Sequence, residues 1–438
     1  MIYTQLRNAI TVSSSPSMTT EDFEIIPQFD YAYDAAGRRV SIVKSGSAFG
    51  DLLGSIDSYT YNARSELTSA RRTKNGQPIP GFSEDFDYDP IGNRRSSATY
   101  NETGEAQTSP YEANNLNQYT SRTTPGYAAV CGEADPNATV TVNENPTFRL
   151  GSYYFGSALF DNSRSGRTAD LLTYAVKEGV AQGVGVEGDG EDLISSHRDQ
   201  VYVLQSPETF AYDDDGNQTL ITTKTGLWRV TYNGEYRPVR WELVSPNSNT
   251  PNSNTQTLLQ MSYDHMGRRR EKNNQRFFYD GYLQVYNIHS LASTHYSNCY
   301  IWDSTESVAT RPLYWQPRMA DGDYSLFYAH DGNKNVSEVV FCQRARGIAA
   351  HYEYVPFGDV LEQTCGNAWG ELDLSSLNPW RFSCEYAEDD TATVYYNYRY
   401  YNPMYGRWVS KDRVIHNLNS YVLICNAVLI LHLRAVDM

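Results

Sequence analysis

The sequence predicts an all-β fold, and three observations lead to this prediction. The chain of 438 residues contains 36 Tyr against 15 Phe, and tyrosine favours strands. A motif of tyrosine, an acid or amide, two variable residues and glycine recurs along the chain, which is typical of repeated structural units. No window of about 12 residues combines a helical period with helix-capping residues.

The recurring motif predicts tight turns between strands. Its tyrosine ends a strand, the Asp or Asn side chain bonds the backbone two residues on, and the glycine supplies a positive φ. Four strong copies read YDAAGRR (33–39), YDPIGNRR (88–95), YDDDGNQ (212–218) and YDHMGRRR (263–270). Their turn residues are Tyr33, Asp34, Gly37, Tyr88, Asp89, Gly92, Tyr212, Asp213, Gly216, Tyr263, Asp264 and Gly267. Weaker copies read YNARSEL (61–67), YNGEYRP (232–238), YDGYLQV (279–285), YAHDGNKNV (328–336) and YEYVPFGDV (352–360).

The distribution of these copies predicts four segments. They are a repeat strip at 1–126, an inserted β-rich module at 127–207, a second repeat strip at 208–325 and a C-terminal region at 326–438. Within the inserted module, TVTVNENPTF predicts a hairpin around Asn143–Asn145.

The C-terminal region contains the densest tyrosine segment, VYYNYRYYNPMYGRW (394–408). Tyrosine combines a large apolar ring with a hydroxyl that prefers a polar partner. This composition favours a thin sheet with both faces near water over a thick aliphatic core.

The repeat copies and the C-terminal region together resemble the YD-repeat proteins, also called RHS proteins. The resemblance is most specific over 326–412, is carried by separate repeats over 29–125 and 208–285, and does not cover 127–207. Besides the tyrosine segment, it depends on YAHDGNKNVSEVV, HYEYVPFGDVL and NPWRFSCEYAEDD. The residues that match the signature of the family's core-associated region are Pro356, Gly358, Pro379, Tyr401, Pro403, Gly406 and Arg407.

This resemblance implies a β-sheet strip that curls into a hollow shell, here only a partial one. In RHS polymorphic toxins the shell encloses a C-terminal effector, and the core-associated region plugs one end. By resemblance, the chain is a non-enzymatic shell fragment, truncated or degenerate at its C-terminal end. The resemblance also implies a secreted or cell-surface location and, in longer relatives, an effector or toxin segment as partner.

Two other functions stay open in the sequence. The family's core-associated region often cuts its effector free with two aspartates, and Asp412 matches the first of them. Arg-Val-Ile follows Asp412 in place of the family's Pro-x-Gly, and Asp437 is a weak match for the second acid. A self-cleaving protease with these two acids is therefore one alternative, because an aspartyl pair needs both carboxylates. The other is a cell-surface adhesin that binds glycan through its tyrosines or through 127–207.

Charge and hydropathy exclude other classes of protein. A net charge of −16, from 36 Lys+Arg and 52 Asp+Glu, leaves no excess of cations for nucleic-acid phosphates. The N-terminus lacks the apolar stretch of a signal peptide. The most apolar run, 421–433, is too short to cross a bilayer. We therefore expect neither a nucleic-acid partner nor a membrane span.

No cofactor or metal site is expected either. GVGVEG (183–188) has the glycine spacing of a dinucleotide site, but the helix that such a site needs does not follow it. AYDDDGN (211–217) resembles a calcium loop with Ala211 at the first ligand position and Thr222 at the twelfth, so a turn explains it better. The eight histidines and six cysteines match no metal-binding or redox spacing.

Overall fold

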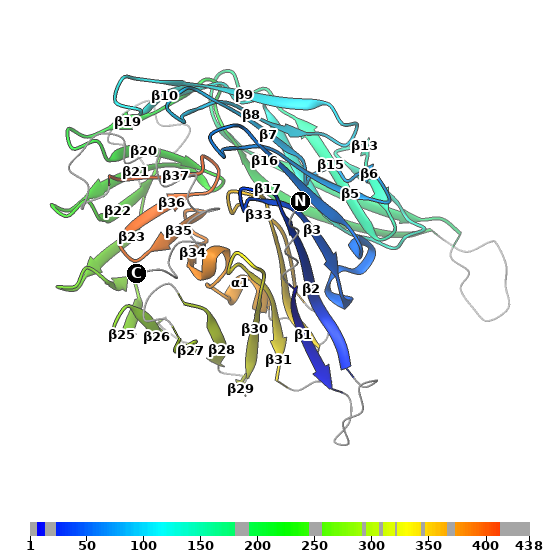
Figure 1. Ribbon diagram of the computed structural model, residues 1–438. Coiled ribbons are helices and arrows are strands. Elements are labelled where there is room, and N and C mark those ends of the chain that lie inside the picture. Colours follow the sequence, from blue (N-terminus) through cyan, green and yellow to red (C-terminus); the bar gives the residue numbers. More distant parts are fainter. Residues whose placement is uncertain are drawn as a thin grey trace. The chain divides into compact units, whose positions relative to one another are not determined.

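The computed structural model describes residues 7–13, 23–179, 192–244, 256–290, 295–305, 310–319, 322–342, 347–365 and 373–411. Strands make up well over half of these residues (Figure 1). The helical elements among them are the single turn α1 (Leu374–Leu377) and the short 3-10 segments η1 (Ser47–Leu52) and η3 (Phe382–Cys384). The prediction of an all-β chain is confirmed.

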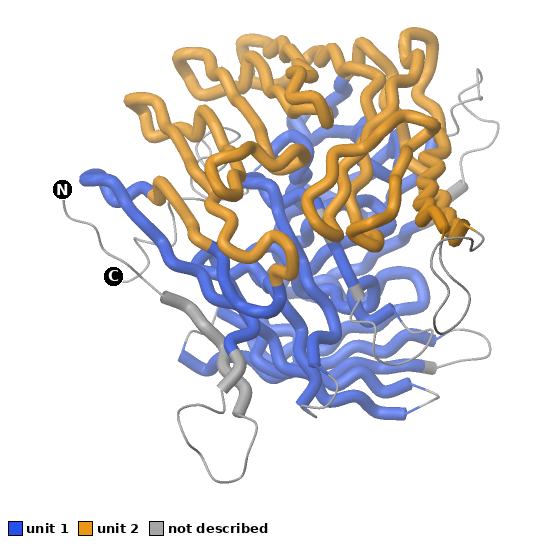
Figure 2. The backbone as a smooth tube through the Cα atoms, turned by 90° about the vertical axis from the view of Figure 1, so that its right-hand side faces the viewer, with its two compact units in different colours: residues 1–38, 44–48, 210–438 blue, residues 39–43, 49–209 orange. Residues whose placement is uncertain are grey.

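The chain divides into two compact units (Figure 2). Unit 1 comprises residues 1–38, 44–48 and 210–438, and unit 2 comprises residues 39–43 and 49–209. This division by contacts is coarser than the four segments expected from the sequence, which stay a prediction.

Unit 1 contains an antiparallel sheet whose strands follow one another in chain order, and a small second sheet. The large sheet consists of β19 (Ala211–Tyr212), β20 (Gln218–Thr223), β21 (Gly226–Tyr232), β22 (Pro238–Leu243), β23 (Gln256–Tyr263), β24 (Arg269–Lys272), β25 (Gln275–Asp280), β26 (Leu283–Ser290), β27 (His295–Trp302), β28 (Pro312–Met319), β29 (Gly322–Asp323), β30 (Leu326–His330), β31 (Val336–Phe341), β32 (Ile348–Tyr354) and β33 (Val360–Cys365). The small sheet consists of β34 (Tyr386–Glu388), β35 (Thr393–Tyr396), β36 (Arg399–Asn402) and β37 (Arg407–Trp408). The unit also holds the hairpin of β1 (Arg7–Ser13) and β2 (Phe23–Tyr33).

Unit 2 also contains antiparallel strands that follow the chain order. They are β4 (Ile56–Tyr61), β5 (Leu67–Lys74), β6 (Gln77–Pro78), β7 (Glu84–Tyr88), β8 (Arg94–Tyr100), β9 (Ala106–Ala113), β10 (Tyr119–Arg122) and β18 (Glu208–Thr209), with β3 (Arg39–Ser45) paired to β4. The segment between β10 and β18 forms two sheets of its own, β11-β15-β14 and β13-β12-β16-β17. Their strands are β11 (Tyr127–Glu133), β12 (Thr139–Val142), β13 (Asn145–Pro146), β14 (Phe148–Leu150), β15 (Tyr153–Leu159), β16 (Arg167–Lys177) and β17 (Leu193–Val203). The expected hairpin is present: Val142 pairs with Asn145 across Asn143 and Glu144, which both have positive φ.

The four strong motif copies fold into one kind of turn. In the first, Asp34 N donates to Arg38 O at 2.9 Å and Gly37 N donates to Asp34 O at 3.0 Å. The Asp34 carboxylate also accepts the backbone N–H of Ala36 and of Arg38. The same two backbone bonds recur at the other three copies, and φ is 77° at Gly37, 94° at Gly92, 85° at Gly216 and 81° at Gly267. The glycine conformation is the one that the motif predicts.

Further turns of this kind show that glycine is not essential to it. Ser65, Tyr236 and Lys334 have φ of 65°, 61° and 63° at the equivalent position. In the copy at 328–336 the positive-φ residue is therefore Lys334 and not Gly332. Two further turns of this kind, at 101–104 and at 114–117, are not among the motif copies identified from the sequence.

In five copies of the motif the tyrosine bonds to the preceding turn. The Tyr263 hydroxyl donates to Pro238 O at 2.7 Å, and Pro238 is the second residue after the positive-φ Tyr236. The same offset and distance join Tyr61 to Arg39 O, Tyr232 to Gln218 O, Tyr279 to Arg269 O and Tyr354 to Val336 O. A phenylalanine could fill the space but could not satisfy the carbonyl group, so these contacts explain why the repeat uses tyrosine.

Candidate functional site: the C-terminal block on the repeat sheet

Residues 373–411, here called the C-terminal block, pack on one face of the large sheet of unit 1. Figure 1 shows β34–β37 and α1, in orange, with the green and yellow strands of that sheet arranged around them. One hydrophobic core joins the two parts, with the rings of Trp241 and Trp315 from the sheet and those of Trp380 and Tyr400 from the block. The Trp241 and Tyr400 ring centroids lie 5.7 Å apart. The block is thus part of the main core of the unit.

The tyrosines of the block are mostly buried, which corrects the expectation of a thin sheet with both faces near water. Tyr395, Tyr400 and Tyr401 are at most 3% exposed, whereas Tyr398 is 47% exposed. Their hydroxyls find partners inside the protein. Tyr401 donates to Phe357 O at 2.9 Å, and Tyr395 accepts the backbone N–H of Arg269 at 2.9 Å. Buried tyrosine is tolerated at Tyr395 and Tyr401 because their hydroxyls reach backbone groups of a strand and a turn.

A buried ionic cluster joins the block to β24. Glu388 of the block is fully buried and forms ion pairs with Arg269, also fully buried, and with Lys272 at 2.6 Å. Burial alone would lower the pKa of the Arg269 guanidinium, but the Glu388 carboxylate more than offsets it and holds that pKa well above its usual value. The guanidinium carbon also lies 4.3 Å from the Tyr395 ring centroid and 4.6 Å from that of Tyr386, which adds cation–π attraction.

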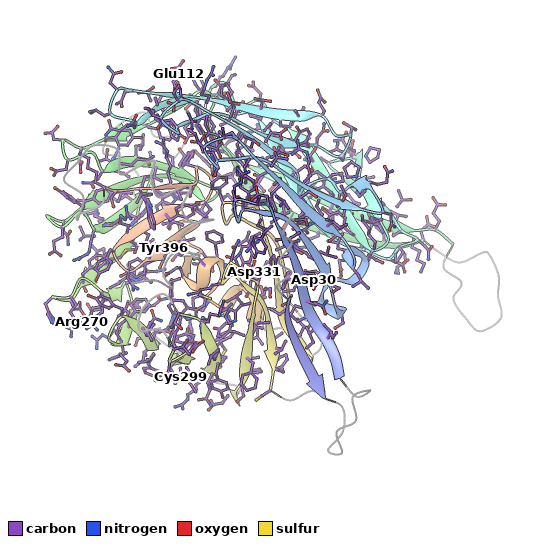
Figure 3. The ribbon with its side chains drawn as sticks, in the orientation of Figure 1. Asp30, Glu112, Arg270, Cys299, Asp331 and Tyr396 are labelled. Atoms are coloured by element: carbon purple, nitrogen blue, oxygen red, sulfur yellow. The ribbon has the colours of Figure 1, made fainter. Side chains whose placement is uncertain are left out.

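Neighbouring residues on β24 differ in direction, as strand geometry requires. Arg269 is buried against the block, while Arg270 is exposed on the opposite face of the sheet. Figure 3 shows Arg270 pointing away from the block and Tyr396 of β35 lying inside the unit. The three consecutive arginines at 268–270 therefore supply one buried ion-pair partner for Glu388, and they do not form a continuous basic surface.

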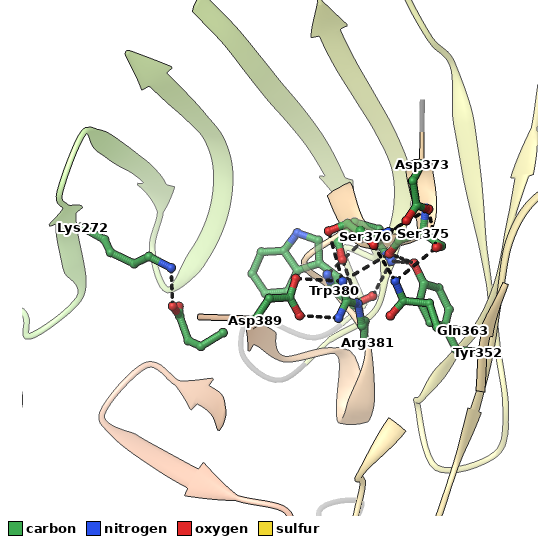
Figure 4. A network of polar contacts seen from close by, with 11 residues as sticks. Lys272, Tyr352, Gln363, Asp373, Ser375, Ser376, Trp380, Arg381 and Asp389 are labelled. Atoms are coloured by element: carbon green, nitrogen blue, oxygen red, sulfur yellow. Dashed lines mark hydrogen bonds and ion pairs between the residues drawn. The ribbon is translucent and has the colours of Figure 1, made fainter. Parts of the chain in front are cut away.

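A second polar network holds α1 to β32 (Figure 4). Arg381 pairs with Asp389 at 2.6 Å and donates to the carbonyl oxygens of Ser375 and Ser376, both at 3.2 Å. The Tyr352 hydroxyl, from β32, donates to Ser375 O at 2.7 Å. These bonds satisfy carbonyl groups that a single helical turn leaves without intrahelical partners.

Asn378 lies at the centre of this network and is fully buried. Its Nδ2 donates to Trp380 O at 2.8 Å and to the Tyr352 hydroxyl at 3.2 Å. Its Oδ1 accepts the Tyr328 hydroxyl at 2.9 Å and Trp380 N at 3.1 Å. All four hydrogen-bonding positions of the amide are used, so this side chain fixes the path of the block over β30 and β32.

The signature residues of the C-terminal region gather at the block and the turn that faces it. Gly358 has φ of 89°, and a Cβ on it would lie 2.4 Å from the Phe382 ring, so only glycine fits. Pro379 O accepts Ala387 N at 2.7 Å, and Pro403 O accepts Gly406 N at 3.1 Å. The remaining signature positions are Pro356 in the Gly358 turn, the buried Tyr401, and Arg407, which pairs with Asn402 between β36 and β37.

The block also contacts both ends of the large sheet. Asn402 Nδ2 donates to Thr222 O on β20 at 3.1 Å, and Ser383 N donates to Asn335 Oδ1 beside β31 at 2.8 Å. Ser383 and Cys384 have φ of 58° and 57°, a strained conformation for residues other than glycine. With the ionic cluster at β24, the block is fastened to the beginning, middle and end of the sheet.

The candidate acids Asp412 and Asp437 lie outside the described residues, as does GVGVEG. The Asp213 carboxylate accepts the backbone N–H of Asn217 at 2.7 Å and its side-chain amide at 2.9 Å, as the predicted turn requires. Over the described ranges no group of three His, Cys, Asp or Glu side chains is placed to hold a metal ion, and no helix there is long and apolar enough to span a membrane.

Comparisons with known proteins add little to this picture. No family model matches the sequence, and no curated protein matches it. Among solved structures, the crystal structure of TcdB2-TccC3-TEV is 16% identical with a TM-score of 0.41, over 96% of this chain and 19% of that chain. A Tc holotoxin pore from Photorhabdus luminescens is 16% identical with a TM-score of 0.37, over 96% of this chain and 19% of that one. The chain spans about a fifth of the length of these structures.

Proposed function

We propose that the chain is a non-enzymatic structural scaffold, a part of a β-sheet shell of the YD-repeat type. The observation that carries this proposal is the contact of Glu388 with Arg269 and Lys272, which fastens the C-terminal block to the repeat sheet through fully buried charges. Removing one member of such a cluster leaves an unpaired buried charge, so the cluster favours one fixed arrangement of block and sheet.

The same contacts argue for a structural role over a catalytic one. The carboxylate of Glu388 is bonded on both oxygens and has no exposed surface, so it is not available to a substrate. Asn378 and Arg381 are likewise engaged by backbone and side-chain groups of the block and of β30 and β32. Catalytic groups need access to the atoms on which they act.

The partner and the location follow from the YD-repeat resemblance. In longer relatives the shell would enclose an effector or toxin segment, and the block would close the repeat sheet next to it. We extend to this chain the secreted or cell-surface location that the resemblance implies.

Limited proteolysis tests the scaffold proposal. With trypsin, the wild-type block should stay protected at Arg399 and Arg407 as long as the large sheet is intact. The Glu388→Gln variant should lose about 3–5 kcal/mol, as expected when one partner of a buried ion pair is removed, and should be cut within the block. Asp390→Asn is the matched control, because Asp390 also contacts Lys272 but its side chain is 54% exposed.

The two outcomes are distinguishable by mass spectrometry of the fragments. Protection in wild type and in Asp390→Asn, with cleavage in Glu388→Gln, supports the fastening of the block. Rapid cleavage of the block from wild-type protein, with the sheet left intact, would show that the block is not fastened and would overturn the proposal.

A further inference from the structure

The hairpin of β16 and β17 ends its sheet with a long, regular strand. Arg167–Lys177 and Leu193–Val203 pair one to one over all eleven positions, without a shift in register. Other hairpins of the chain, such as β25–β26 and β27–β28, contain such shifts. In the part of the chain that the structure describes, β17 is the last strand in the order β13-β12-β16-β17. Its outer edge therefore presents backbone groups for pairing.

The first half of β17 is open to solvent on both faces. Every residue from Leu193 to Arg198 is exposed, and the apolar Leu193 and Ile194 are 62% and 63% exposed. The second half is covered, because Val203 is 3% exposed and Val201 packs on a small core cluster. The open edge is thus a defined segment, centred near Ser196.

This edge has few of the features that usually block strand pairing, which are proline, lysine and other charged residues, and bulges. The sequence LISSHRDQVYV has no proline or lysine, its pairing with β16 has no bulge, and its charged residues are one Arg and one Asp. Its two charged side chains already have partners inside the hairpin: Arg198 forms an ion pair with Asp170 of β16, and Asp199 is hydrogen-bonded to His197 at 3.1 Å. One Arg and one Asp give β17 a formal charge of zero, in a chain with a net charge of −16.

We propose that this edge pairs in an antiparallel manner with β17 of a second copy of the chain, about a two-fold axis at Ser196. An axis perpendicular to the sheet makes each face of one copy continuous with the same face of the other. It also lies at the centre of the open segment. Ser196 would lie opposite its own copy, and Ile194 opposite the aliphatic stem of Arg198. Arg198 would be diagonal to Asp192 of the copy, and no two like charges would lie directly opposite each other.

A second copy is the partner that these features favour. The segment is complementary to itself under a two-fold axis, and two-fold dimers are the commonest symmetric assemblies. Directly opposite and diagonal side-chain pairs of this kind stabilise antiparallel strand pairing. A dimer also covers the exposed Leu193 and Ile194 of both copies, which favours association through the hydrophobic effect.

Sedimentation velocity on the full chain at about 150 mM salt tests the pairing. Wild-type protein should sediment as a dimer, with twice the 49.6 kDa mass of the chain. Ser196→Lys would place two ammonium groups opposite each other at the axis and should give a monomer. Ser262→Lys is the matched control: Ser262 is also exposed and on a strand, but β23 has neighbours on both sides and Ser262 pairs with Glu271, so this variant should stay dimeric.

A cysteine variant tests the register independently. Residues directly opposite have Cβ atoms roughly 4.5–5.5 Å apart, and diagonal ones roughly 7–8 Å, so only the former approach disulfide distance. Under mild oxidation, Ser196→Cys should give a covalent dimer on a non-reducing gel, while Ser195→Cys should match wild type. A monomeric wild-type protein, an unchanged mass in Ser196→Lys, or equal crosslinking of both cysteine variants would overturn the proposal.

Discussion

The hydroxyl of Tyr263 lies 2.7 Å from the carbonyl oxygen of Pro238, and so bonds one repeat to the turn of the repeat before it. Tyr263→Phe would keep the ring but leave that carbonyl group without its partner. We expect a loss of about 1–2 kcal/mol in the free energy of unfolding. Tyr174→Phe is the control, since Tyr174 is 41% exposed on β16, and thermal denaturation should show little change for it. Equal melting temperatures for wild type and Tyr263→Phe would contradict this role.

The second prediction concerns the effect of substitutions at Gly92 on stability. Its φ of 94° is unfavourable for a β-branched residue, so Gly92→Val should destabilise the protein by about 1 kcal/mol or more. Gly92→Asn should cost less, because asparagine tolerates this region and Asn117 occupies the same turn position with φ of 61°. Thermal denaturation of both variants checks the difference, and an unchanged melting temperature in Gly92→Val would refute it.

The pH dependence of stability should contain a contribution from Glu385, which follows the strained Ser383 and Cys384. Burial raises the pKa of the Glu385 carboxyl from 4.5 to about 8. The folded state therefore binds this proton more tightly than the unfolded state. The resulting stabilisation is complete below pH 4.5 and is lost as the pH rises to about 8.

We therefore expect a lower melting temperature at pH 8 than at pH 6.5, and Glu385→Gln should remove most of this fall. Burial lowers the pKa of His289 to about 4 and that of His330 to about 3. Stability from these neutral histidines is complete above pH 6.5 and is lost only as the pH falls below it, so they do not contribute to the measured interval. The same fall in wild type and in Glu385→Gln would exclude the carboxyl as its cause.

Self-cleavage is not expected of this chain. Asp412 is not followed by the Pro-x-Gly that YD-repeat proteins have at this position, and Asp437 is only a weak match for the second acid that an aspartyl pair needs. Purified protein should stay a single band near 49.6 kDa at pH 5 and at pH 7. A discrete fragment that disappears in Asp412→Asn would restore the protease alternative.

Association between copies should depend on salt. The net charge of −16 opposes it, and salt screens that repulsion, with a Debye length of about 3 Å at 1 M. Light scattering should therefore show the dimer fraction rising from low salt toward about 1 M. A monomer over the whole range would mean that the strand edges are protected.

The sequence predicted the local structure of the repeats better than their long-range contacts. The turns at Gly37, Gly92, Gly216 and Gly267 were predicted because Asp and Gly determine them over five residues. The turn at 101–104 could have been predicted, because Tyr100, Asn101 and Gly104 match the tyrosine, amide and glycine of the motif. The turn at 114–117 could not, because Ala113 and Asn117 replace the tyrosine and the glycine.

The site depends on contacts that no local pattern encodes. Glu388 and Arg269 are 119 positions apart, and no sequence motif around either residue predicts its contact with the other. The tyrosine segment was recognised, but its burial was not, because the partners of Tyr395 and Tyr401 are backbone groups of distant strands and turns. Propensity and spacing indicate strands and turns, whereas the face on which a block packs is decided by the whole sheet.

The two kinds of contact have opposite consequences for how such a chain can change in length during evolution. Five motif tyrosines bond to the turn immediately before them. A duplicated repeat would reproduce this local contact, so a repeat can be gained or lost by recombination as far as these bonds are concerned. The C-terminal block instead constrains the number of residues between its contact points on the sheet. Asn402 binds Thr222 across 180 positions, and Glu388 binds Arg269 across 119. Ser383 likewise binds Asn335 beside β31. Between β20 and β31 the number of repeats is therefore fixed, and gain or loss of repeats is tolerated only outside that interval.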